Sequence, residues 1–180
     1  MKNTGIYTFL LLLVLAFCSC QQTSPDKVIG VTVLNTNQVT AFFRPRFFSE
    51  LLERKKQNSI PVIKDGKTDM NGTAMDYVKM MAIDRVNGAL TSVNEIEETE
   101  ETKPLIGASK DLLEFGKKIF ENDYVAVAKM IDEGKPQTEI DAAISSIFET
   151  NDAALTQKVK ILDDLAMPYA KKHGVDLRVI

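Results

Sequence analysis

The sequence predicts an all-α protein, an antiparallel four-helix bundle, and three observations support this class. Long segments carry apolar residues at spacings of three and four, which places these residues on one face of a helix. Proline, glycine and helix-capping residues divide the segments into four predicted helices of roughly 20 to 36 residues. At least two of the links between them are short, which is typical of antiparallel neighbours in a bundle.

The first predicted helix covers residues 38–57, after the polar residues 35–37, which can cap it. Its apolar face carries Val39, Phe43, Phe47 and Leu51, each four residues from the next. Pro45 interrupts this segment, so either the helix begins at Pro45 or it continues through Pro45 with a kink.

The second predicted helix, 69–98, has the clearest pattern. Its apolar positions are Met75, Val78, Ala82, Val86, Ala89, Val93 and Ile96. These steps of three and four approach a heptad seam over about three heptads. The third helix, 103–132, begins near Pro104 and is closed by Gly134 and Pro136, and the fourth, 137–172, ends before Gly174.

Three short segments resemble strands rather than helices. Residues 28–34 are rich in β-branched side chains, residues 60–63 form a short apolar stretch, and the tail 175–180 alternates apolar and polar residues. We expect that these segments could pair into a small two- or three-stranded sheet at one end of the bundle.

The N-terminal residues show a secretory pattern. Lys2 is followed by an apolar run over residues 9–17 and then by Cys18 and Cys20. An apolar run of about ten residues is typical of a signal peptide, and it is too short for a comfortable membrane span, which needs roughly 20. Ser19 supplies a small residue directly before Cys20.

This stretch resembles a bacterial lipoprotein signal, in which cleavage precedes a cysteine that receives diacylglycerol and acyl chains such as palmitate. The resemblance covers residues 1–20 only. It implies a cleaved signal peptide at 1–19, lipid attachment at Cys20 and a lipidated tether at 20–27. An ordinary cleaved signal peptide is the alternative. The remaining residues, 28–180, form one predicted helical-bundle domain of a size that can bury a core.

Charge and composition argue against several function classes. The chain has a formal charge of −3, and removal of residues 1–19, which carry the single charge of Lys2, leaves −4. No long basic run is present, so nucleic acid is not an expected partner. His173 is the only histidine, and the Glu-x-x-His pattern of di-iron bundles is missing, so we expect neither a metal nor another cofactor.

The sequence contains no recognisable set of catalytic residues, and we expect none. An enzyme using carboxylates such as Asp163 and Asp164 is a minor alternative. A second alternative is a bundle that carries a small apolar ligand between its helices, because Met70, Met75, Met80 and Met81 could line such a site.

The most suggestive stretch is residues 41–48, where four phenylalanines and two arginines flank Pro45. One helical seam does not easily bury all four rings. The predicted partner-binding residues are Phe42, Arg44, Arg46 and Phe48, because interfaces favour aromatic residues and arginine. The sequence therefore predicts an exported, lipid-anchored envelope protein that binds or scaffolds an envelope protein and touches the membrane through its lipid.

Overall fold

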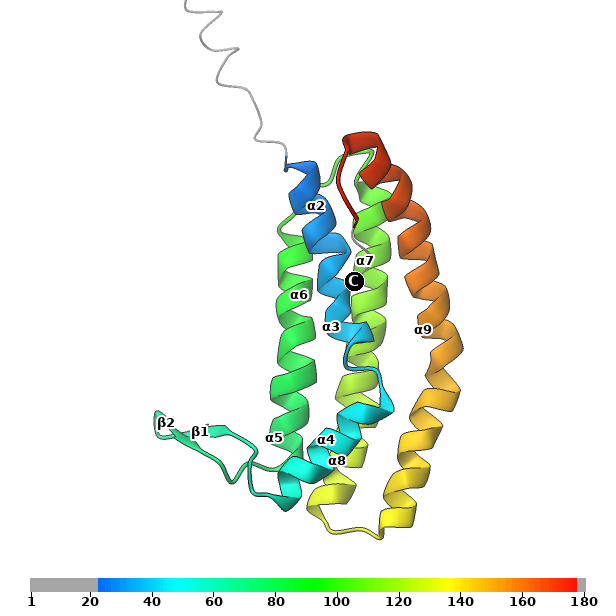
Figure 1. Cartoon of the computed structure of the whole chain (residues 1–180). Helices are drawn as coiled ribbons and strands as arrows, with labels where there is room; N and C mark the ends of the chain where they lie inside the picture. Colours follow the sequence, from blue (N-terminus) through cyan, green and yellow to red (C-terminus); the bar gives the residue numbers. More distant parts are fainter. Residues whose placement is uncertain (1–22, 178–180) are drawn as a thin grey trace, which may run out of the picture.

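The computed structural model describes residues 23–177, and these residues are mostly helical, as predicted. Helices packed side by side form a bundle, and a two-stranded hairpin extends sideways from its lower end (Figure 1). The chain passes along the bundle four times, and we call each pass a column. One continuous cluster of buried apolar residues lies between the columns.

The first column comprises α2 (Pro25–Thr32), the short 3-10 turn η1 (Leu34–Thr36), α3 (Asn37–Thr40) and α4 (Pro45–Lys56). The strand predicted at 28–34 is therefore wrong, because most of that segment is helical.

The physical reason for this helix lies just before the segment. The Ser24 hydroxyl accepts a hydrogen bond from the backbone N–H of Lys27 at 3.4 Å, and Pro25 occupies the first turn, so a helix begins there. Val28, Ile29 and Thr32 then pack into the bundle from one face of α2. The ordered helix thus begins three residues before the predicted domain start at 28.

The first column breaks between α3 and α4, so the predicted helix 38–57 is two helices. Arg44 is extended, with φ −148°, and Pro45 starts α4 in its first turn. Of the two predicted possibilities, the start at Pro45 is confirmed. The hydroxyl of buried Tyr124 donates a hydrogen bond to the carbonyl oxygen of Phe42 at 3.0 Å, which satisfies a backbone group at the break.

The hairpin consists of β1 (Val62–Lys64) and β2 (Lys67–Asp69), paired antiparallel. Asp65 and Gly66 form the turn, and both have positive φ, which is typical of a two-residue type I′ turn. The predicted strand at 60–63 thus begins two residues later and ends one residue later than predicted, and it pairs locally. It does not pair with the chain ends, since residues 28–34 are mostly helical and residues 175–177 form no strand. Residues 178–180 lie outside the described part.

The second column contains α5 (Ala74–Val78), the π-helical turn η2 (Lys79–Ile83) and α6 (Asp84–Asn94). The third contains α7 (Lys103–Ile119), the π-helical turn η3 (Phe120–Tyr124) and α8 (Val125–Asp132). The two π turns contact each other.

The spacing of buried residues explains both π turns. The second column buries Ala74, Val78, Ala82 and Val86, and the third buries Leu112, Gly116, Phe120, Tyr124 and Ala128. In an α-helix, four residues cover one full turn plus about 40°. After four such steps, a side chain would therefore point about 160° away from the first one around the helix axis. A π turn takes up an extra residue and brings the buried face back toward the core.

The fourth column is the single long helix α9 (Gln137–His173), which matches the predicted helix closely. It packs mainly against α7 and ends at Gly174, whose φ of 68° is the left-handed conformation that closes many helices. Pro168 lies inside α9 without ending it.

Asp132 joins three helices at the lower end of the bundle. Its carboxylate accepts hydrogen bonds from the backbone N–H groups of Ala74 (2.9 Å) and Met75 (3.1 Å), and Lys55 Nζ lies 2.8 Å away. Burial raises the pKa of Asp132, but the hydrogen bonds from Lys55 and from the two N–H groups outweigh burial and hold this pKa below its usual value. α4, α5 and α8 are therefore fixed together at the base of the hairpin.

Candidate functional site

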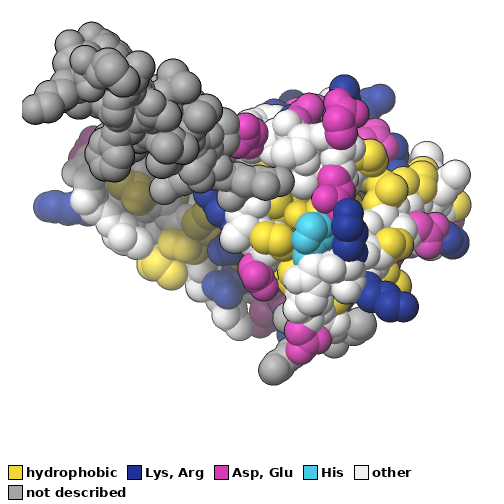
Figure 2. Space-filling view, turned by 90° about the horizontal axis from the view of Figure 1, so that it is seen from above, with side chains coloured by type: hydrophobic (Ala, Val, Ile, Leu, Met, Phe, Trp, Pro, Cys, Tyr) yellow, Lys and Arg dark blue, Asp and Glu magenta, His cyan; other side chains and the backbone are white. Residues whose placement is uncertain are grey.

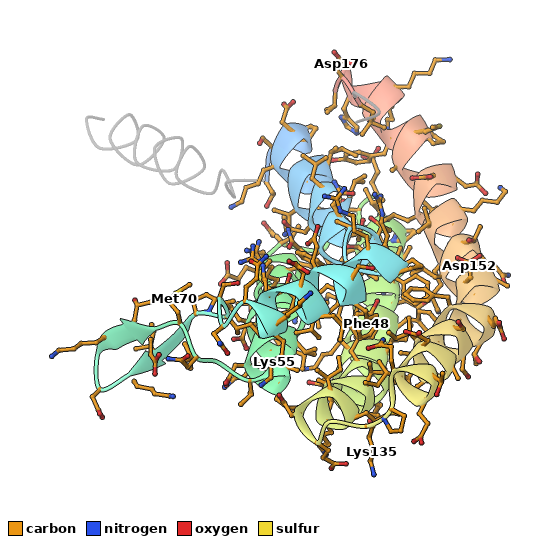
Figure 3. The ribbon with its side chains drawn as sticks, turned by 60° about the horizontal axis from the view of Figure 1, so that its bottom comes forward. Phe48, Lys55, Met70, Lys135, Asp152 and Asp176 are labelled. Carbon is orange, nitrogen blue, oxygen red and sulfur yellow. The ribbon has the colours of Figure 1, made fainter. Side chains whose placement is uncertain are left out.

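The predicted partner-binding residues divide into a buried and an accessible group. Phe48 is only 1% exposed, and its ring centroid lies 4.5 Å from that of Tyr124 (Figure 3). Phe47 is buried beside it and contacts Tyr77 and Tyr124. The prediction that Phe48 faces a partner is wrong, because α4 crosses the bundle and packs against both α5 and α9, so more than one of its sides is covered (Figure 1).

Phe42, Arg44 and Arg46 remain at the surface. A shallow cavity of about 230 Å³ lies among them and is also lined by Glu50. Arg46 Nε pairs with Glu50 at 2.8 Å, and Arg44 Nε donates to the carbonyl oxygen of Thr40 at 3.2 Å. The half-buried ring of Phe42 lies under the guanidinium of Arg85, 5.6 Å from its centroid. This surface keeps an accessible aromatic edge with three nearby arginines.

A larger groove lies between the hairpin and the second column. Its volume is about 550 Å³, which is the size of a small-molecule or peptide site. The residues that line it come from the hairpin segment and from α5, η2 and α6: Pro61, Val62, Ile63, Thr68, Asp76, Lys79, Met80 and Asp84. Sequence reasoning missed this groove because it needs the hairpin to project beside the helices.

One face of the hairpin turns toward this groove. Ile63 and Thr68 are directly opposite each other in the ladder, so their side chains share a face, and both line the groove. Ile63 is 77% exposed, and Met70, at the base of the hairpin, is 45% exposed (Figure 3). Two large apolar side chains are thus accessible on one short projecting element, which is a feature of interaction surfaces.

The opposite face of the hairpin is mostly polar: it carries Lys64, Lys67 and Asp69 beside Val62. Lys64 Nζ pairs with Asp69 at 3.1 Å, and Asp69 also accepts hydrogen bonds from the backbone and side-chain N–H groups of Asn71. The N–H group of Asn71 and the ammonium of Lys64 lower the pKa of the Asp69 carboxyl. These contacts stiffen a hairpin that would be marginal on its own.

The other end of the bundle, where the described chain begins, is highly charged. Figure 2 looks onto this end and shows His173 among acidic and basic side chains. Glu101 binds Lys172 Nζ at 2.8 Å and His173 Nε2 at 2.9 Å, and both hydrogen bonds lower its pKa. The ring of Tyr169 lies against that of His173, with centroids 4.5 Å apart and the ring planes tilted by 41°. His173 is therefore held in a local cluster at the C-terminal turn of α9.

Other predicted candidates lie apart from the groove. Asp163 and Asp164 are exposed on α9, where Asp164 pairs with Lys160 at 2.5 Å. Within residues 23–177, no group of three or more His, Cys, Asp or Glu side chains is arranged to hold a metal ion. No helix in this same range is long and apolar enough to cross a membrane. Cys20 lies outside the described residues.

The methionines predicted to line a ligand site divide between surface and core. Met75, Met80 and Met81 are partly buried against the apolar core, and Met80 also lines the groove beside the hairpin. Met70 lies at the base of the hairpin. The predicted cluster is thus spread over several surroundings.

Comparisons with known proteins add no further information on the site. The chain matches no protein-family model, no curated protein and no solved structure.

Proposed function

We propose that this chain is an exported protein, lipidated on Cys20 and anchored to a bacterial cell-envelope membrane, and that it acts as a non-catalytic binding or scaffolding module. In this proposal an antiparallel four-helix bundle with a broken first helix is the scaffold. The groove beside the hairpin and the surface formed by Phe42, Arg44 and Arg46 are its candidate contact surfaces for an envelope protein.

The observation that supports this proposal is the short distance in sequence between Cys20 and the bundle. Only residues 21 and 22 separate Cys20 from Thr23, the first described residue, and α2 begins at Pro25. Three residue steps span at most about 11 Å. A lipid on Cys20 would therefore hold the charged end of the bundle, which carries Glu101 and His173, close to the bilayer surface.

The same geometry would place the groove away from the bilayer. The second column runs from Ala74, near the hairpin, to Asn94, near the end where α2 begins (Figure 1). This column has 21 residues, so its length is about 30 Å at 1.5 Å per residue. An anchored bundle would thus present its hairpin about 30 Å from the membrane, where a second envelope component can reach it.

A matched pair of variants tests the anchor. The full-length chain is expressed in a bacterium with labelled palmitate, and membrane and soluble fractions are separated. Cys20→Ala should lose the label and leave the membrane, because it removes the modified sulfur. Cys18→Ala, two residues away, should keep both label and membrane location. Label retained by the Cys20→Ala variant, or lost from the Cys18→Ala variant, would refute lipidation at Cys20.

A second candidate function is the binding of a small apolar ligand. The groove of about 550 Å³ supports it, because Met80, Val62 and Ile63 give it adaptable apolar walls. Native mass spectrometry of the purified full-length protein should then show an additional small-molecule mass. Replacing Met80 with Lys should remove that mass, whereas Met167→Lys, on the exposed surface of α9, should not.

A further inference from the structure

We propose that two copies of this chain pair side by side through the free edges of β2, which would form a four-stranded antiparallel sheet with a two-fold axis at Thr68. Within residues 23–177, β1 and β2 form a sheet of only two strands, so each strand has one unpaired edge. Such an edge is a ready template for another strand. This inference depends on the lipid anchor proposed above, which would bring copies together on one membrane.

The backbone of β2 is arranged for pairing at Thr68. The register places Lys64 opposite Lys67 and Ile63 opposite Thr68. The residues that flank a two-residue turn form a hydrogen-bonded pair, and the next pair is of the non-hydrogen-bonded kind. The N–H and C=O groups of Thr68 therefore point outward from the hairpin edge, where the same groups of a second copy can meet them.

The charges of β2 are complementary to themselves in this register. With Thr68 opposite Thr68 of the second copy, Lys67 lies opposite Asp69 of that copy, and Asp69 lies opposite its Lys67. Opposite charges and paired threonines both favour cross-strand pairing. The corresponding pairing through β1, centred on Ile63, would place Val62 opposite Lys64 and gains no ion pair. The side chains thus favour β2 over β1.

The orientation of the hairpin is compatible with two anchored copies. The hairpin is narrow in Figure 1 and opens into a broad loop in Figure 3, so its plane lies across the bundle axis. The Ile63–Thr68 face looks along this axis toward α5 and α6, as the lining of the groove shows. A two-fold axis perpendicular to the sheet therefore runs along the bundles, and both copies would direct their α2 ends at the same membrane.

Pairing would also join the two grooves. Because edge-to-edge pairing keeps each face of the sheet on the same side, Ile63 and Thr68 of both copies would form one row across the sheet. Two strands of three residues bury far less than the roughly 1,200 Å² of a stable soluble interface. Confinement to a membrane raises the effective concentration of the second copy, so we expect pairing there and dissociation after dilution in detergent.

Cysteine cross-linking of the full-length chain in its membrane tests the pairing. Thr68→Cys should form a disulfide-linked dimer under mild oxidation, since directly opposite residues lie within the roughly 7 Å Cα separation that a disulfide allows. Ile63→Cys is the matched control, because its equivalent would lie three strand spacings away, about 14 Å. We expect at least about tenfold more dimer from the first variant.

Charge reversals make the test specific for β2. In the Thr68→Cys background, Lys67→Asp and Asp69→Lys should each reduce the dimer strongly, because like charges then face each other. Co-expression of these two variants with different tags should restore a mixed dimer, which an unfolded hairpin could not do. Equal cross-linking of the Ile63→Cys control, unchanged dimer after both reversals, or no mixed dimer would each overturn the proposal. Mass spectrometry of the protein from the same membranes shows independently whether Cys20 carries the lipid, so failure of the pairing is distinguished from failure of the anchor.

Discussion

The tight contact between α3 and α7 at Gly116 gives a prediction with an unusual sign. Gly116 is buried near the end of α7, inside the continuous third column, where alanine normally favours the helix over glycine by about 1 kcal/mol. A Cβ at this position, however, would lie 2.5 Å from Cγ1 and 3.0 Å from Cβ of Val39. Gly116→Ala should therefore destabilise the protein.

The magnitude follows from the overlap. Optimal carbon–carbon contacts lie at about 3.5 to 4.0 Å, so the added methyl group overlaps Val39 by roughly 1 Å. Val39 is fully buried, and its β-branched side chain has essentially one rotamer in a helix, so it has no free space to move into. Overpacking of this kind costs about 1 to 3 kcal/mol. After the gain in helix propensity, we expect a net loss of about 1 to 2 kcal/mol.

Gly107 on the same helix is the matched control. A Cβ there meets nothing within 4 Å, so Gly107→Ala should stabilise the protein by about 0.5 to 1 kcal/mol. Urea unfolding followed by circular dichroism measures both variants. Val39→Ala removes the two overlapping methyl groups, so Gly116→Ala should cost much less in that background. If Gly116→Ala stabilises the chain as much as Gly107→Ala does, the packing argument is wrong.

Two further predictions concern the lower half of the bundle. Phe48→Ala should lower the free energy of unfolding, measured in urea, by about 3 to 5 kcal/mol. Phe42→Ala, at a half-buried position, should lower it by less than about 2 kcal/mol. Equal losses would contradict the assignment of Phe48 to the core. Asp132→Asn should destabilise the protein by about 1 to 2 kcal/mol at pH 7, because it weakens the cap of α5 and the pair with Lys55. The folded pKa of Asp132 is lowered, so its contribution is complete above the unfolded value near 3.9 and is lost as pH falls through the lower folded value. The melting temperatures of the original protein and of the Asp132→Asn variant should therefore converge at acid pH. A constant difference between them down to pH 2 would contradict this.

The helices at 103–132 and 137–173 could be predicted closely because local signals mark both ends. Proline and glycine separate them, and long runs of apolar residues keep helical spacing between these signals. Residues 28–34 show the limit of composition as a guide. Their β-branched side chains favour a strand, but the cap at Ser24 and the first-turn proline determine the start of a helix whose buried face accommodates the same residues.

The candidate site was harder to predict because it depends on tertiary packing. The aromatic residues at 41–48 stand out in the sequence, but the crossing of α4 over the bundle decides which rings are covered, and the sequence alone does not predict that crossing. The groove combines a hairpin with helices that begin several residues later. In the sequence, the short apolar stretch 60–63 followed by an Asp65-Gly66 turn was a local signal that could have indicated a projecting hairpin.

The facing π turns have a consequence for how the bundle can move. Two ordinary helices can slip past one another by a full turn and recover nearly equivalent side-chain packing. Here such sliding would place the π turn of each column against an ordinary α-helical turn of the other. The rings of Phe120 and Tyr124 would then lose their present packing contacts. The second and third columns should therefore keep one axial position relative to each other.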